Sequence, residues 1–275
     1  MIKKIIHISD IHVRKYDRHE EYVEIFKKLA KSIQTECKGL KKDEIRIVVC
    51  GDIAHQKNNI SPESSIMLFK LFTLFDKLGK TIIIAGNHDY LVSNKDRMDC
   101  ITPVIEMGNY KNMYFLDRLL DYESGYMEDD NVCWALYSSF SDFSCPPNLD
   151  TYKEENPDKK IIGLFHGSVV GAKLDNGTTM ENGVDTNSFK DCDVVLAGHI
   201  HKMQEIKQNG VRIVYAGSLI QQDMGETVSG HGYLLWDVET MEYKWIQLDN
   251  DYAMYKIEIN SIDDIDEDLE KYLNL

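Results

Sequence analysis

The sequence predicts an α/β fold whose N-terminal part alternates strands and helices. Short apolar runs rich in β-branched residues, without polar alternation, are typical of strands covered on both faces. Between them, apolar residues recur at helical spacing, and Ser61-Pro62-Glu63 has the cap, proline and acid of a helix start. Strands alternating with helices indicate parallel pairing. Strands are expected over residues 5–9, 45–50 and 81–85, and helices over 20–38 and 61–78.

Beyond about residue 110 the pattern predicts mainly strands. Residues 139–159 and 167–185 are expected to be loops, because they contain Pro146-Pro147 and many Gly, Asn and Thr residues. No linker is evident, so we expect one domain over 1–250, followed by 251–275 as a terminal strand and acidic tail. Strands are expected over 113–116, 132–137, 161–165, 194–197, 211–215, 232–236, 243–248 and 252–259.

The composition is that of a globular protein with a strong acidic balance. The 275 residues include 31 Lys and Arg against 46 Asp and Glu, a net charge of −15, which argues against a passive nucleic-acid binder. Residues 117–130 and 260–275 carry much of this excess, and we interpret them as a solvated loop and a solvated tail.

No apolar run is long enough to span a membrane, and the N-terminus turns to charge too early for a secretory signal. We therefore expect a cytoplasmic protein with no membrane partner. The six cysteines form no C-x-x-C pair and are expected to be reduced.

Polar side chains follow five of the predicted strands directly. The carboxyl ends of strands in α/β sheets are where ligand sites form. Imidazole, carboxylate and amide groups suit divalent manganese, iron or zinc, and the set is large enough for two adjacent metals, the usual device for displacement at phosphorus. Asp52 is the best candidate to bridge the two ions. The five motifs are Asp10-Ile11-His12, Gly51-Asp52, Gly86-Asn87-His88-Asp89, His166-Gly167 and Gly198-His199-Ile200-His201.

The order D-x-H, G-D, G-N-H-D, H-G and G-H-x-H resembles the calcineurin-like metallophosphoesterase superfamily over about residues 4–237. The resemblance implies that 1–250 form a metallophosphoesterase domain, a β-sandwich of two mixed sheets flanked by helices. It also implies two metal sites that share one carboxylate, and a catalytic histidine oriented by an acidic neighbour. The first site would consist of Asp10, His12, Asp52 and His201, the second of Asp52, Asn87, His166 and His199, with His88 and Asp89 as the catalytic pair.

Finer features resemble the DNA-repair exonuclease branch, the SbcD and Mre-eleven nucleases. They include G-D-x-x-H at 51–55, Tyr215-Ala216-Gly217-Ser218 and Gly225-Glu226. This resemblance implies a nuclease of DNA repair or recombination with two Mn²⁺ ions and a metal-bridging hydroxide. Such an enzyme would degrade DNA from 3′ ends and cut single strands. The implied partners are DNA, an SbcC-type SMC-like ATPase and a second copy in a homodimer. Members of the branch usually continue into a capping domain, of which residues 251–275 would be at most the start.

Four further groups have a functional and a structural interpretation. His55 would help to place the DNA end, or would only cap its loop. Arg14, Lys15 and Arg18 would grip a phosphate, or would form a solvated approach to the first helix. His231 would lie on the rim near the metals, or only at a strand edge.

Two other functions share these motifs. A small-molecule or cyclic-nucleotide phosphodiesterase would use the same ligand set. An inactive scaffold of the same fold would be expected to lose ligands, above all at the position of His88, and every motif residue is present here.

Overall fold

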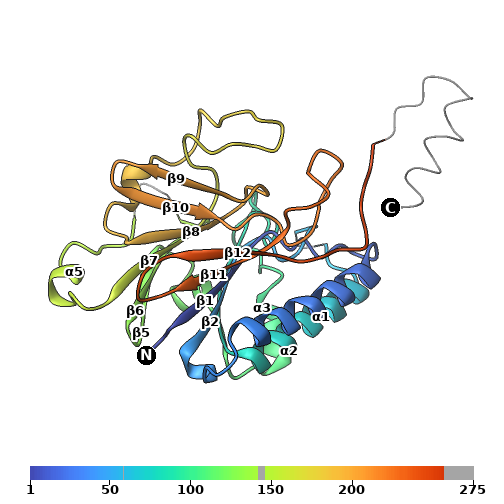
Figure 1. Ribbon diagram of the computed structural model, residues 1–275, viewed down its shortest axis with the longest axis horizontal. Helices are drawn as coiled ribbons and strands as arrows, with labels where there is room; N and C mark the ends of the chain where they lie inside the picture. The colour runs from blue at the N-terminus through green and yellow to red at the C-terminus, as the bar shows by residue number, and fades with distance from the viewer. Residues whose placement is uncertain (58, 142–145, 257–275) are drawn as a thin grey trace, which may run out of the picture.

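The computed structural model describes residues 1–57, 59–141 and 146–256, which form two six-stranded sheets packed face to face (Figure 1). The strand order is β12-β11-β1-β2-β3-β4 in the first sheet and β5-β6-β7-β8-β10-β9 in the second. Both sheets mix parallel and antiparallel pairs. The predicted sandwich of two mixed sheets is therefore confirmed.

The elements have the following bounds in chain order. The strands are β1 Lys4–Ile8, β2 Ile45–Cys50, β3 Lys80–Ile84, β4 Met113–Phe115, β5 Gly125–Asp129, β6 Val132–Tyr137, β7 Lys160–His166, β8 Val194–Gly198, β9 Gln204–Gln208, β10 Val211–Tyr215, β11 Gly232–Asp237 and β12 Tyr243–Gln247. The α-helices are α1 His19–Glu36, α2 Pro62–Leu78, α3 Thr102–Gly108, α4 Leu116–Leu119 and α5 Tyr152–Glu155, and the 3₁₀ turns are Lys42–Glu44 and Thr186–Phe189.

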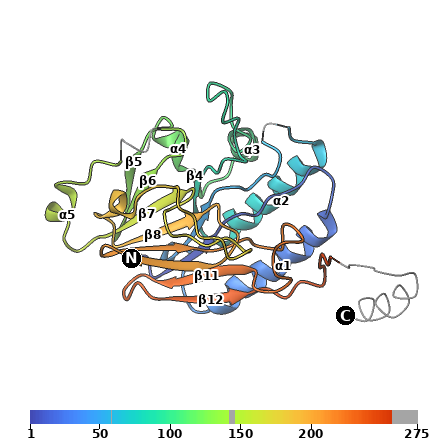
Figure 2. The ribbon, with the colours of Figure 1, turned by 90° about the horizontal axis from the view of Figure 1, so that it is seen from above.

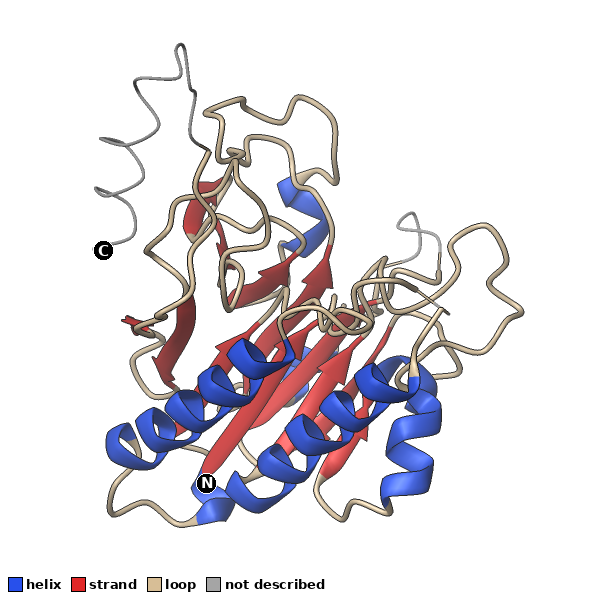
Figure 3. Ribbon diagram, turned by 90° about the vertical axis from the view of Figure 1, so that its right-hand side faces the viewer, coloured by secondary structure: helices blue, strands red, loops and turns tan. Residues whose placement is uncertain are grey.

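The two faces of the sandwich are covered differently. Helices α1 and α2 lie over the outer face of the first sheet, where Ile6 and Ile8 of β1 pack against them (Figures 2 and 3). Ile5 points the other way and joins the core between the sheets. The outer face of the second sheet is covered mainly by the segments between β6 and β8, through residues such as Tyr152 and Phe189.

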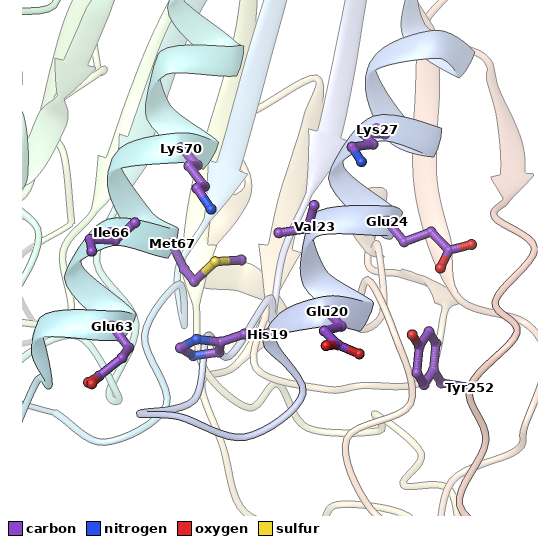
Figure 4. Close-up of a pocket in the computed structure, with 10 residues that line it drawn as sticks. All are labelled: His19, Glu20, Val23, Glu24, Lys27, Glu63, Ile66, Met67, Lys70 and Tyr252. Atoms are coloured by element: carbon purple, nitrogen blue, oxygen red, sulfur yellow. The ribbon is translucent and has the colours of Figure 1, made fainter.

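Helix α2 begins where the sequence predicted. Ser61 Oγ accepts a hydrogen bond from Ser64 N at 3.1 Å, and Pro62 occupies the first helical position. A groove of about 580 Å³ separates the first turns of α2 and α1 and includes Val23 and Ile66 (Figure 4). None of the five motifs lines this groove. No helix among the described residues has the length and apolar character to cross a membrane.

Several expected boundaries were wrong. The acidic segment 117–130 is no solvated loop, because it forms the end of α4 and then β5, with Asp117 and Asp129 buried. The loop expected over 139–159 contains α5, and β9 was not predicted as a strand. No strand forms over 252–256, while residues 257–259 and the acidic stretch 260–275 lie outside the described residues.

Candidate metal centre

The carboxyl ends of β1, β2, β3, β7 and β8 bring the five motifs together. β1, β2 and β3 are parallel neighbours in the first sheet, and β7 and β8 are parallel neighbours in the second. The rim therefore takes side chains from both sheets. Asp10, His12, Asp52 and His199 have φ between 51° and 93°, a conformation that non-glycine residues adopt rarely.

The first cluster consists of Asp10, His12 and His201. His12 Nε2 lies 3.1 Å from His201 Nε2 and 4.0 Å from Asp10 Oδ1, and His201 Nε2 lies 3.8 Å from the same Asp10 oxygen. One ligand atom from each residue thus converges on one point, as at a metal site.

The second cluster consists of Asp52, Asn87, His166 and His199. Asn87 Oδ1 lies 3.2 Å from His166 Nε2 and 3.0 Å from His199 Nδ1, and Asp52 Oδ1 lies 3.3 Å from His166 Nε2. The donor set is the imidazole, amide and carboxylate set that the sequence predicted.

Asp52 belongs to both clusters. Its Oδ2 lies 3.5 Å from His12 Nε2 while its Oδ1 faces His166, so each oxygen addresses a different cluster. Gly86 makes this position possible, because a Cβ there would stand 2.2 Å from Asp52 N and Oδ1. The carboxylate is buried and lies where a bridging ligand between two ions would lie.

The imidazoles are oriented by partners on their other nitrogens. His166 Nδ1 donates to the carbonyl of Cys50 at 2.7 Å, which leaves Nε2 as the ligand atom. Burial lowers the pKa of His12 well below its usual value and that of His199 to about 4, so both rings are neutral. Burial also opposes the charging of His166, but Asp52 outweighs it and raises that pKa to about 9.

His88 lies beside the two clusters. Its backbone N–H donates to Asp52 Oδ1 at 2.8 Å, and its Nδ1 lies 2.6 Å from the carbonyl of His55, which requires Nδ1 to carry the proton. Nε2 is then the nitrogen available to a bound molecule. The ring centroid lies 4.9 Å from that of His12.

The prediction that Asp89 orients His88 was wrong. Asp89 Oδ1 accepts from the backbone N–H groups of Ile53 and Ala54, each at 2.9 Å, and Oδ2 accepts from Gly86 N at 2.8 Å. The buried carboxylate therefore ties the loop after β2 to the loop after β3. The partner of the His88 ring is a backbone carbonyl instead.

His55 and Arg14 lie next to the first cluster. His55 stacks on His88, its Nδ1 lies 3.4 Å from His12 Nδ1, and its Nε2 lies 3.3 Å from Arg14 Nη1. Arg14 also donates from Nη2 to the carbonyl of Gln222 at 2.8 Å. Both side chains therefore lie next to the first cluster.

Lys15, Arg18 and His231 are placed differently. Lys15 is half-buried, and its carbonyl accepts from Ser61 Oγ at 2.5 Å. Arg18 forms a bidentate pair with the buried Glu21, through Nε at 2.6 Å and Nη2 at 2.7 Å. His231 is buried, with Nδ1 3.0 Å from Ser218 Oγ and Nε2 2.7 Å from the carbonyl of Thr227. Arg18 Nη1 has no partner among the described residues but is buried, and both ring nitrogens of His231 have partners, so the structural interpretation fits these two residues better than a contact with substrate.

Two cavities flank the clusters. One of about 690 Å³ borders Asn87, His166 and His199 and is walled by Tyr90 and Phe165. Another of about 290 Å³ borders His199 and His201 and reaches Glu226. A bound molecule can therefore approach the ligand atoms from either side.

Glu226 is a site residue that the sequence reasoning missed as such. Its Oε1 lies 2.6 Å from His201 Nδ1, although the residue stands 25 positions further along the chain. Gly225-Glu226 was one of the sequence features that resemble the nuclease branch, but nothing in the sequence indicated that Glu226 contacts His201.

The donors fit two divalent ions. Asp10 and Asp52 are buried carboxylates within 4.0 Å of imidazole nitrogens, and charge at such depth requires compensation. Asp10, His12 and His201 form one set of convergent ligand atoms, and Asp52, His166 and His199 form another. Two cations would supply the compensation that two buried carboxylates need.

Two known proteins are similar to this chain in sequence. The chain is 36% identical over 263 residues to the uncharacterized protein R555 of Acanthamoeba polyphaga mimivirus, covering 94% of this chain and 19% of that protein. It is 23% identical over 257 residues to the SbcD component of the SbcCD nuclease of Staphylococcus epidermidis, covering 86% of this chain and 66% of that component. The chain thus spans about a fifth of the first relative and about two thirds of the second.

Among solved structures, the chain is similar to a novel archaeal phosphodiesterase. The TM-score is 0.42 at 14% identity, over 89% of this chain and 99% of the other. The family model described as calcineurin-like phosphoesterase matches residues 3–203, which include all five motifs. The chain belongs to the calcineurin-like phosphoesterase family.

Proposed function

We propose that the chain is a two-metal phosphodiesterase that hydrolyses DNA. The observation that carries the proposal is a pair of donor clusters that share Asp52, with His88 beside them. Membership of a phosphoesterase family supports metal-dependent hydrolysis. The similarity to a nuclease subunit supports a nucleic-acid substrate, and we propose DNA, cleaved as by an exonuclease and single-strand endonuclease.

The ligands divide between the two ions as the clusters do. Asp10, His12 and His201 would hold one ion, Asn87, His166 and His199 the other, and Asp52 would contact both. Two such ions polarise phosphoryl oxygens and supply a nucleophile at neutral pH. Mn²⁺ suits the mixture of imidazole, amide and carboxylate donors.

His88 acts on the substrate rather than on the metals. Because Nδ1 is used by the carbonyl of His55, a protonated Nε2 can hydrogen-bond to a phosphoryl oxygen or protonate the leaving oxygen. Arg14, whose Nη1 lies 3.3 Å from His55 Nε2 and whose Nη2 donates to the carbonyl of Gln222, would place a positive charge near a neighbouring phosphate. His55 orients both groups through its ring and its carbonyl.

The first test is manganese-dependent degradation of duplex and single-stranded DNA. Replacing His88 by Asn should lower the rate at least 100-fold, since general acid or base groups contribute about 10²–10⁴-fold. Elemental analysis should still find two Mn²⁺ per chain, because the backbone N–H that contacts Asp52 is retained.

Two outcomes would count against the proposal. Intact DNA together with rapid hydrolysis of a cyclic nucleotide would establish the small-molecule phosphodiesterase instead. Elemental analysis that finds a single Mn²⁺ per chain at saturating Mn²⁺ would contradict the two-metal assignment.

The partners follow from the relative. The name of the Staphylococcus epidermidis protein places it in a nuclease of more than one subunit, and we propose that this chain likewise works with an SbcC-type ATPase and as a homodimer. Light scattering of the purified chain, alone and with such an ATPase, measures both associations. A chain that stays monomeric and does not bind the ATPase would contradict the proposed partners.

A further inference from the structure

His201 of the first cluster contacts a carboxylate through the ring nitrogen that faces away from the cluster. His201 Nε2 faces His12 and Asp10, while Nδ1 lies 2.6 Å from Glu226 Oε1. Glu226 is 7% exposed. The imidazole therefore lies between a buried carboxylate and the point where the ligand atoms converge.

The Glu226 carboxylate is fixed before anything binds. Its Oε2 accepts from Gln222 N at 2.9 Å and lies 3.2 Å from Ser218 Oγ. Its own carbonyl accepts from Gln221 Nε2 at 3.1 Å. Oε2 and the backbone carbonyl are thus held by the loop that follows β10, which leaves Oε1 directed at His201.

The two clusters differ in this respect. His166 in the second cluster donates Nδ1–H to a backbone carbonyl, that of Cys50. His201 instead donates to a carboxylate, whose charge makes the hydrogen bond stronger and the opposite nitrogen a better donor to a cation.

We infer that Glu226 is a positioning residue that fixes the ring and tautomer of His201 and thereby sets the affinity of the first metal site. The inference rests on the proposed metal assignment. It predicts unequal effects at the two sites, because the hydrogen bonds of Glu226 within the described part of the chain do not include Asn87, His166 or His199.

Calorimetric titration of Mn²⁺ into the metal-free chain tests the role. Glu226→Gln keeps the shape but removes the charge, and one of the two binding steps should weaken by about 10–100-fold, the usual effect of losing such a partner. The other step should remain at its wild-type affinity. Asp223→Asn is the matched control, since Asp223 lines the same cavity but its Oδ1 accepts only from Gly225 N among the described residues, and both steps should be unchanged.

The outcomes separate this inference from the proposed function. Two wild-type steps in Glu226→Gln would overturn the role of Glu226 while leaving the two-metal site intact. No binding to the wild-type chain would overturn the proposed function itself. The melting temperature of each metal-free variant checks folding. If Glu226→Gln does not fold, Glu226→Asp, which keeps the charge but withdraws it from Nδ1, should still weaken the same single step, and wild-type binding there would overturn the role.

Discussion

Asp117, at the start of α4, is a buried carboxylate outside the metal clusters. Its Oδ2 accepts from Ala85 N at 2.8 Å and its Oδ1 from Ser138 Oγ at 2.5 Å. The residue thereby holds the end of β3, two residues before Asn87, to the segment that follows β6. Burial raises its pKa to about 6 despite these hydrogen bonds.

This raised pKa gives a defined pH dependence of stability. Between pH 3.8, the ordinary pKa of a carboxyl group, and about pH 6, Asp117 is protonated in the folded chain but ionised in the unfolded chain. The contribution of this proton to the free energy of unfolding is therefore complete below pH 3.8 and is lost as the pH rises through 6. Asp117→Asn keeps the shape and one acceptor oxygen for Ala85 N, and its amide N–H can donate to Ser138 Oγ as a protonated carboxyl would, so it should stabilise the chain above pH 7 by up to about 3 kcal/mol and change little at pH 4. Urea unfolding of both chains across this range measures the difference. A pH-independent difference would contradict it.

At the scale of elements, Asp129 of β5 ties the second sheet to the first. It accepts from Arg46 Nε of β2 at 2.6 Å, from Arg46 Nη2 at 2.9 Å and from Lys80 Nζ of β3 at 3.0 Å. Trp134 Nε1 of the neighbouring β6 lies 3.2 Å from the same carboxylate. The two sheets are therefore joined by a buried ion pair as well as by their apolar faces.

Removal of one member of a buried pair leaves the other charge uncompensated. Asp129→Ala should lower the free energy of unfolding by about 3–5 kcal/mol. The adjacent Glu128, whose partner Lys159 lies at the surface, is the control, and Glu128→Ala should cost less than about 1 kcal/mol. Equal losses in denaturant titrations of the two variants would show that the Asp129 pair contributes no more than a surface pair.

At the scale of the whole molecule, the candidate ligands come from both sheets, so the two proposed ions would join the two layers of the sandwich. A ligand that binds only the folded chain raises the free energy of unfolding, by about 2.7 kcal/mol per site when the free ligand concentration is 100 times its dissociation constant. Mn²⁺ should therefore raise the melting temperature, and a chelator should reverse the rise. His88→Asn should keep the full shift, and Asp52→Asn should lose most of it. An unchanged melting temperature with Mn²⁺ would argue against ions at this rim.

The net charge of −15 also has a different meaning for the whole molecule. It argued against nucleic acid when all acids were counted as surface charge. Asp117 and Asp129 from the acidic segment are buried, and Asp10 and Asp52 face the positions proposed for cations. The charge that DNA would meet at a metal-loaded rim is therefore less negative than the composition indicates.

The sequence by itself determined the layered fold and the convergence of the motifs. β1, β2 and β3 are largely buried on both faces, and their motifs follow directly, so the shared direction of these three strands brings Asp10, Asp52 and Asn87 to one edge. Short, half-exposed elements such as β9 were missed because their burial pattern is weak.

Only the tertiary structure decided which side chains orient the ligands. Asp89 follows His88 in the chain yet bonds to the loops after β2 and β3, whereas Glu226 reaches His201 from 25 residues away. Arg18 and His231 likewise have the right chemistry but are used by Glu21, Ser218 and Thr227. The physical reason is that strand periodicity fixes where a residue lies, but a hydrogen bond depends on the side-chain partners that packing brings within about 3 Å.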